Sequence, residues 1–197
     1  NPETLARPWV APGVPKMEHR LGGLEKAHLT GGVSYDPHNH EMMIRLRDEK
    51  VKRVREEIPA TAVNGEDSGE LLLVGWGSTY GVILGAAANL RAQGRKVSCI
   101  HLRYINPLPS DLKDVFSRFE TVVVAEMNLG QLAMILRAET LVDIQKITKV
   151  QGQPFKESEI VDKSLEIMDG KSDSPFLVKT LENILEDGLN QPAKPVH

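Results

Sequence analysis

The chain has 197 residues and a formal net charge of −3, from 24 basic and 27 acidic side chains. This length suits one well-packed domain with extensions. The even mixture of charges argues against a nucleic-acid-binding chain, which needs a clustered excess of Lys and Arg. The one cysteine, Cys99, cannot alone build a disulfide framework, an iron–sulfur cluster or a thiolate zinc site, which favours a reducing, cytoplasmic setting. No apolar run approaches the roughly 20 residues that span a bilayer, so no membrane contact is expected.

The first 69 residues are expected to form little core of their own. Residues 1–39 carry Pro and Gly without sustained periodicity, which predicts extended or looping backbone. Asn39 can cap a helix that continues to about Glu57. Residues 60–70, rich in Gly, Asn and Asp, predict a linker. The chain opens at Asn1 without an initiator Met, which suggests a piece of a longer polypeptide, although a processed N-terminus would look the same.

From Leu71 onward, short apolar runs alternate with amphipathic helices, a pattern typical of a parallel sheet with helices on both faces. The fold class is therefore α/β. Residues 70–190 are expected to form an open, mainly parallel sheet with helices on both faces, a Rossmann-like three-layer arrangement, and residues 191–197 a tail. Right-handed crossovers are expected. The predicted strands are 71–74, 97–102, 121–125 and 146–150. The predicted helices lie around 83–90, 112–119, 131–142, 157–168 and 175–187.

A glycine-rich turn, Gly75-Trp76-Gly77-Ser78-Thr79-Tyr80-Gly81, follows the first predicted strand. Such a turn before a helix resembles a dinucleotide loop, in which the helix N-terminus holds an anion. Arg103 at the end of the second strand would then favour a 2′-phosphate. A tight βα turn with a capping Ser or Thr explains the same residues structurally. Trp76 favours a third reading, a protein contact, because aromatic side chains suit buried interfaces.

Polar residues also follow the other strands at the edge where open α/β sheets place ligands. Glu126, Asn128 and Gln131 come after the third strand, and a capped helix start explains them nearly as well. Arg103 and Tyr104 are interpreted first as interface residues and second as ligand contacts. His38 and His40 near Asp36 form an H-x-H pattern that could bind a transition metal, with a loop before a helix as the alternative. Motifs of zinc hydrolases and of nucleophile elbows are absent.

Several ordered segments resemble the α-subunits of 2-oxoacid:ferredoxin oxidoreductases. The resemblance extends over roughly residues 7–160 and is carried by Leu21-Gly22-Gly23-Leu24-Glu25-Lys26, Ser34-Tyr35-Asp36-Pro37, Asn39-His40-Glu41, Val74 to Gly81, His101-Leu102-Arg103-Tyr104, Pro107-Leu108-Pro109, Glu126-Met127-Asn128, Gly130-Gln131-Leu132 and Gly152-Gln153-Pro154-Phe155. By this resemblance, residues 1–69 leave a preceding thiamine-pyrimidine domain, and residues 70–190 form a transketolase-C-terminal-like domain.

The resemblance implies oxidative decarboxylation of 2-oxoglutarate or a similar 2-oxoacid to an acyl-CoA, with reduction of ferredoxin. It implies thiamine diphosphate, magnesium, an iron–sulfur cluster and coenzyme A for the whole complex, none of them bound by this chain alone. The implied partners are a β-subunit, ferredoxin through the complex, and optionally a second α-subunit. The chain alone would be inactive and would serve assembly, since the cofactor performs the chemistry and the protein supplies position.

No catalytic residue can be assigned. The candidates for an interface or the edge of a site are Trp76, Ser78, Arg103, Tyr104, Glu126, Asn128 and Gln131. The rival hypotheses are a free-standing NADP-binding Rossmann module and the C-terminal domain of a 2-oxoacid dehydrogenase β-component. Which 2-oxoacid is used cannot be deduced from these residues.

Overall fold

The computed structural model describes residues 1–19 and 22–170, so the helix predicted at 175–187 and the tail at 191–197 lie outside the described residues. The chain divides into two compact units. The first comprises residues 1–61 and 103–112, and the second comprises residues 62–102 and the described residues from Lys113 onward.

The first unit is built around helix α1 (Pro37–Arg53), which continues as the short 3₁₀ helix η1 (Val54–Glu57). The predicted cap at Asn39 is wrong: Asp36 is the N-cap, and its carboxylate accepts from the backbone N–H of His38 at 2.9 Å. Pro37, whose fixed φ suits the first helical position, follows the cap directly. Asn39 instead bonds to the backbone of His28 and Lys26, and so ties the preceding loop to the helix. No residue of α1 is buried.

The second unit contains a four-stranded parallel sheet in the order β2-β1-β3-β4. The strands are β1 (Gly69–Trp76), β2 (Val97–Leu102), β3 (Phe119–Glu126) and β4 (Ile144–Thr148). The predicted α/β class with a parallel sheet is therefore confirmed. The prediction of β4 at 146–150 is two residues late at each end, because Lys149 and Val150 already belong to the following turn.

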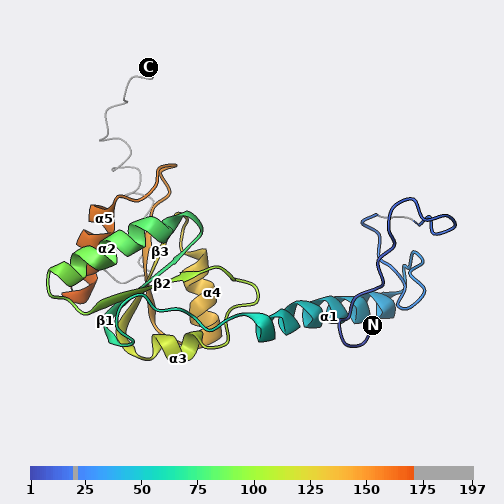
Figure 1. Ribbon diagram of the computed structural model, residues 1–197, viewed down its shortest axis with the longest axis horizontal. Helices are drawn as coiled ribbons and strands as arrows, with labels where there is room; N and C mark the ends of the chain where they lie inside the picture. Colours follow the sequence, from blue (N-terminus) through green and yellow to red (C-terminus); the bar gives the residue numbers. More distant parts are fainter. Residues whose placement is uncertain (20–21, 171–197) are drawn as a thin grey trace, which may run out of the picture. The chain divides into compact units, whose positions relative to one another are not determined.

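Helices cover both faces of this sheet. Helices α2 (Tyr80–Ala92) and α5 (Glu157–Met168) lie on one face, and α4 (Gln131–Thr140) lies on the other with the short α3 (Leu112–Phe116) (Figure 1). Helix α3 ends at Phe116, three residues before the end predicted at residue 119, because β3 already begins at Phe119. The face below α2 and α5 holds a continuous apolar core that includes Leu71, Leu73, Ile83, Leu90, Val123 and Ile160.

The segment before β1 protects one edge of the sheet. Asn64 forms an antiparallel bridge with Cys99, with N–H to O distances of 2.8 and 3.0 Å. The Ser98 hydroxyl donates to the carbonyl of Glu66 at 2.7 Å. Part of the predicted linker therefore covers the outer side of β2, a common way to shield an edge strand. Burial raises the pKa of the Cys99 thiol, so its reactive thiolate form is disfavoured.

Candidate functional site

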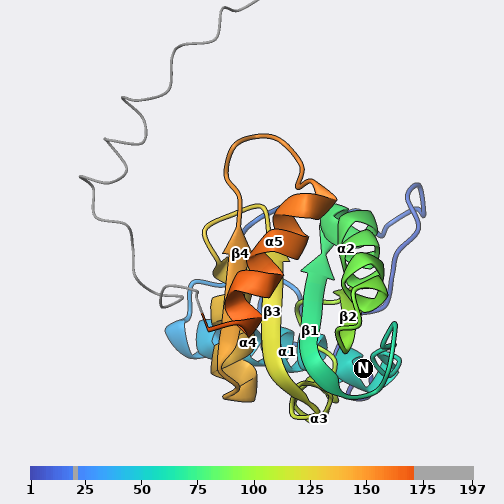
Figure 2. The ribbon, with the colours of Figure 1, turned by 90° about the vertical axis from the view of Figure 1, so that its left-hand side faces the viewer.

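The turns after β1, β3 and β4 meet at the carboxyl edge of the sheet, because all strands run in the same direction (Figure 2). This edge is where open α/β folds place ligands. It carries five of the seven candidates chosen from the sequence: Trp76, Ser78, Glu126, Asn128 and Gln131. We call residues 75–81 the β1–α2 turn and residues 126–131 the β3–α4 turn.

The β1–α2 turn is closed by its own threonine. The buried Thr79 hydroxyl accepts from the N–H of Trp76 at 3.0 Å and donates to the carbonyl of the same residue at 2.9 Å. Gly77 has φ +56°, which a glycine adopts without strain. Trp76 is half-buried, and Ser78 is exposed with its hydroxyl 3.7 Å from the sulfur of Met127. The two turns therefore touch each other.

The glycines of this turn do not have the roles of a dinucleotide loop. A Cβ on Gly75 would lie 2.2 Å from Cδ1 of Ile83 and 2.7 Å from the Thr79 hydroxyl, so this glycine allows strand and helix to pack closely. In a dinucleotide loop the third glycine has that function. Here the third glycine, Gly81, faces open space. The turn is explained by packing, without a phosphate.

Glu126 is a fully buried carboxylate that begins the β3–α4 turn. One carboxylate oxygen accepts from the N–H of Leu132 at 2.9 Å and the other from the N–H of Ala133 at 3.0 Å. These N–H groups belong to the first turn of α4, where backbone donors have no partner within the helix. The negative charge also suits the positive end of the helix dipole. Glu126 therefore occupies the position that an anionic ligand would need.

Asn128 and Gln131 complete the β3–α4 turn. The Asn128 side-chain oxygen accepts from the N–H of Gly130 at 2.8 Å and of Gln131 at 3.3 Å. The Gln131 side chain accepts from the N–H of Leu129 at 3.0 Å. Together with Glu126, these side chains bond the backbone N–H groups of residues 129–133. The start of α4 is thus filled by the protein's own side chains.

His101 and Tyr80 form an additional pair at this edge that was not among the candidates. Their ring centroids lie 4.8 Å apart with an interplanar angle of 59°. His101 belongs to β2, and Tyr80, which is 53% exposed, begins α2. An aromatic residue in the first turn of a helix and a histidine near the end of the neighbouring strand are the sequence signals that could have indicated the pair.

Arg103 and Tyr104 belong to the first compact unit and are both exposed. Their segment continues to Asp111, whose carboxylate accepts from the N–H and the hydroxyl of Thr61, each at 2.7 Å. This pair of bonds fixes the segment within its own unit. Arg103 and Tyr104 remain candidates for an interface.

The turn after β4 is held by a lysine that sequence reasoning missed. The Lys149 ammonium is 2.7 Å from Glu159 and 3.0 Å from the carbonyl of Pro154, and it lies 5.9 Å from the ring centroid of Phe155. The side chain of Lys149 is 9% exposed. The lysine hydrogen bond is the main cause that lowers the pKa of Glu159. The buried lysine and its carboxylate partner therefore stabilise the turn after β4.

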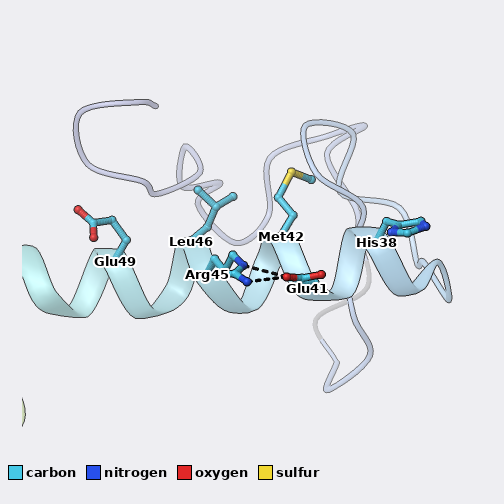
Figure 3. Close-up of a pocket in the computed structure, with 6 residues that line it drawn as sticks. All are labelled: His38, Glu41, Met42, Arg45, Leu46 and Glu49. Carbon is cyan, nitrogen blue, oxygen red and sulfur yellow. Dashed lines mark hydrogen bonds and ion pairs between the residues drawn. The ribbon is translucent and has the colours of Figure 1, made fainter.

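The H-x-H pattern of the first unit does not converge on a common site. Nδ1 of His40 lies 2.7 Å from Glu25, whereas His38 lines a shallow groove along α1 with Met42 and Leu46 (Figure 3). Glu25 also pairs with Arg47 at 3.0 Å, and these hydrogen bonds, Arg47 first, lower its pKa to about 2. Within residues 1–19 and 22–170, no group of three or more His, Cys, Asp or Glu side chains could hold a metal ion.

Comparison with known proteins identifies relatives among the 2-oxoacid oxidoreductases. Residues 69–160 match the family model of pyruvate:ferredoxin oxidoreductase core domain II. The 2-oxoglutarate oxidoreductase subunit KorA of Mycobacterium tuberculosis is 48% identical over 159 residues, which are 80% of this chain and 24% of that protein. Subunit alpha of 2-oxoacid:ferredoxin oxidoreductase 1 of Aeropyrum pernix is 35% identical over 155 residues, which are 75% of this chain and 24% of that one.

A solved structure agrees with these matches. The 2-oxoglutarate:ferredoxin oxidoreductase of Magnetococcus marinus, solved with 2-oxoglutarate, coenzyme A and succinyl-CoA bound, superposes with a TM-score of 0.74 and 34% identity. The match covers 84% of this chain and 29% of that chain. The chain thus spans about a quarter of the length of the curated relatives. Among the helices that the structure describes, none has the length and apolar character required to cross a membrane.

Proposed function

Because this chain belongs to the family of 2-oxoacid:ferredoxin oxidoreductase α-subunits, we propose that it is the part of such an α-subunit that supports assembly and performs no chemistry itself. The whole enzyme would decarboxylate 2-oxoglutarate or a similar 2-oxoacid oxidatively to an acyl-CoA and reduce ferredoxin. In this proposal, residues 1–69 connect to a preceding domain and residues 70–190 form the assembly domain. The enzyme is placed in the cytoplasm, in keeping with a single, buried cysteine.

One observation carries the assembly role: the start of α4 at the carboxyl edge is filled by the protein's own side chains and surrounded by exposed apolar ones. Glu126 and Asn128 accept hydrogen bonds from the backbone N–H groups at the start of α4, so these groups are not available to bind an anion. Tyr80, Met127 and Leu129 are exposed nearby on the same edge. Exposed aromatic, thioether and aliphatic side chains suit contact with protein better than contact with a phosphate.

The candidates then divide into two groups. Trp76, Ser78, Arg103 and Tyr104 are proposed to contact another part of the enzyme directly. Glu126, Asn128 and Gln131 are proposed to act indirectly, because their side chains are bonded to the turn that they form. This division refines the hypothesis that all seven lie at an interface or at the edge of a site.

The cofactors of such an enzyme are proposed to be held outside this chain. The one cysteine of this chain is buried and cannot alone supply the thiolates of an iron–sulfur cluster, and the described residues contain no group of three or more His, Cys, Asp or Glu side chains that could hold a metal ion. A β-subunit, or another part of the α-subunit, would supply those ligands. Coenzyme A and 2-oxoglutarate are bound in the relative from Magnetococcus marinus, and we propose the same ligand classes for the complete enzyme.

The test uses the complete α-subunit purified from its native source. Recovery of a cysteine-rich partner, with reduction of a viologen dye that depends on a 2-oxoacid and on coenzyme A, is expected. Calorimetry with millimolar NADP should show no binding. NADP binding without a partner would instead establish the Rossmann alternative, and acyl transfer to lipoamide would establish a 2-oxoacid dehydrogenase.

A further inference from the structure

Residues 103–111, which we call the β2–α3 segment, connect the end of β2 to the start of α3. The chain enters the first compact unit twice, once over residues 1–61 and again over residues 103–112. The β2–α3 segment is therefore grouped with α1 and not with the strand that precedes it. The bonds between these two stretches of the first unit determine where the segment lies.

Asp111 supplies the polar link between the two stretches. One of its carboxylate oxygens accepts from the N–H of Thr61 and the other from the Thr61 hydroxyl, each at 2.7 Å. Hydrogen bonds to an ionised carboxylate are about twice as strong as those between neutral groups. Among the described residues, these two are the only hydrogen bonds that join the β2–α3 segment to residues 1–61. The polar attachment of the segment therefore depends on one pair of residues.

Thr61 and Asp111 lie at points where the chain passes between the units. Thr61 is the last residue of the first stretch, and Asp111 is followed by Leu112, the last residue of the second stretch. The opposite end of the segment is continuous with β2 and is already held by the sheet. The bonds at Asp111 thus restrain a loop at its free end, which removes much of its conformational freedom.

The segment has an exposed half and a buried half. Pro107 and Leu108 are buried, and the rings of Pro107 and Pro109 fix φ at two positions of the backbone. Tyr104 and Ile105 are 45% and 39% exposed. These exposed residues lie between β2 and the buried half, so their positions depend on how both ends of the segment are held.

We propose that the Thr61–Asp111 pair is a latch that keeps the β2–α3 segment ordered, so that Arg103 and Tyr104 are presented to another part of the enzyme in a fixed position. This inference rests on the interface role proposed above for Arg103 and Tyr104. Thr61 and Asp111 are positioning residues, since neither needs to touch the partner. An ordered segment loses less conformational entropy on binding than a mobile one, which strengthens association.

The first test measures the order of the segment in the 197-residue chain. Asp111→Ala removes both acceptors, and trypsin cleavage after Arg103 should become about tenfold faster or more, because proteolysis of a held loop requires local opening. Asp162→Ala is the matched control, because Asp162 is exposed on α5, and it should leave the cleavage rate unchanged. Cleavage after Arg137 in α4 should stay slow in both variants, which shows that the sheet and its helices remain folded.

Two variants of the partner residue grade the effect. Thr61→Val keeps the backbone N–H and loses the hydroxyl, so cleavage after Arg103 should accelerate less than in Asp111→Ala. Thr61→Ser keeps both donors and should be cleaved at the wild-type rate. Thr61→Val also tests the latch if Asp111→Ala does not fold.

The second test measures assembly of the complete α-subunit with its β-subunit. Asp111→Ala should weaken binding about tenfold, whereas the rate of viologen reduction at saturating β-subunit should equal that of the wild type. In a Tyr104→Ala background, Asp111→Ala should weaken binding little further, because the latch acts through the presented side chain. A general loss of stability would instead give losses that add.

The outcomes separate the latch from the assembly role. If cleavage after Arg103 is equally fast in Asp111→Ala and in the wild type, the latch is overturned. If cleavage accelerates but the wild-type α-subunit binds no partner, the latch is supported and the assembly role is overturned. If the wild type assembles and the losses of Tyr104→Ala and Asp111→Ala add, the positioning role of the latch is overturned.

Discussion

Replacing Glu126 by alanine should destabilise the fold more than most single substitutions. The carboxylate is completely buried and accepts two N–H bonds at 2.9 and 3.0 Å, and both bonded residues are themselves buried. A hydrogen bond to a charged group contributes about 1.5–3 kcal/mol, and a buried donor left without a partner costs a similar amount. We expect Glu126→Ala to lower the free energy of unfolding by about 3–5 kcal/mol, a large part of the roughly 5–15 kcal/mol of a typical domain.

The conservative variant separates charge from shape. In Glu126→Gln the amide oxygen can still accept from one N–H, but the amide NH₂ faces the other donor. A loss of about 2–3 kcal/mol is therefore expected. Glu139→Gln is the matched control, because Glu139 is exposed on the same helix. It should change stability by no more than about 0.5 kcal/mol.

Urea denaturation of the 197-residue chain, followed by far-UV circular dichroism, measures these differences. Hydrogen exchange adds a local test: the amides of Leu132 and Ala133 should lose protection in Glu126→Ala before the rest of the sheet does. If Glu126→Ala costs less than about 1 kcal/mol with an unchanged denaturant slope, the two bonds do not stabilise α4 in solution and the reasoning is refuted.

Two further predictions follow from the close contacts of Gly75 and from the ion pair of Glu25 with Arg47 in the first unit. Gly75→Ala should lower the free energy of unfolding by about 1–3 kcal/mol, because its Cβ would overlap the neighbouring helix. Gly81→Ala, which faces open space at the start of α2, should be neutral or slightly stabilising. Equal melting temperatures for the two variants would contradict this difference. Because the pKa of Glu25 is lowered from 4.5 to about 2, its contact should stabilise the first unit above pH 4.5 and be lost as the pH falls through about 2. A carboxyl NMR titration should show a midpoint near 2 that moves toward 4.5 in Arg47→Gln, and an unperturbed midpoint in the wild type would disprove the contact.

The alternation of apolar runs and amphipathic helices was sufficient to predict the parallel sheet and the helices that cover it. Strand β2 and helix α5 were predicted with the observed bounds, because each is a continuous periodic segment with turn residues on both sides. The predicted boundaries were wrong where a side-chain hydrogen bond or a backbone conformation, neither of which periodicity reveals, sets the end of a helix. Asp36 begins α1 because its carboxylate reaches His38, and α4 ends at Thr140 because Leu141 adopts φ +58°.

The sequence predicted where the candidate site lies in the fold, and it did not predict the contacts of its side chains. Parallel strands bring their carboxyl ends to one edge, so Glu126 and the β1–α2 turn could be expected there. Which groups the Glu126 carboxylate would bond depended on the path of the backbone after β3, and the sequence offered an open ligand site and a capped helix as nearly equal alternatives. Lys149 was missed because its partner, Glu159, lies ten residues away across a turn of irregular backbone. His101 was missed because the periodicity of β2 does not show that its ring packs against Tyr80 of α2.

The same hydrogen bonds explain both why the N–H groups at the start of α4 are not available to an anion and why the turn before it is ordered. A helix start that binds phosphate must leave its N–H groups free and its turn open to solvent. Here Glu126, Asn128 and Gln131 occupy these groups and order the turn, so the backbone polarity is satisfied inside the protein. What remains outside is the apolar side chain of Leu129. Weakening the inner bonds, as in Glu126→Gln, should therefore reduce assembly even though none of these three side chains needs to touch the partner.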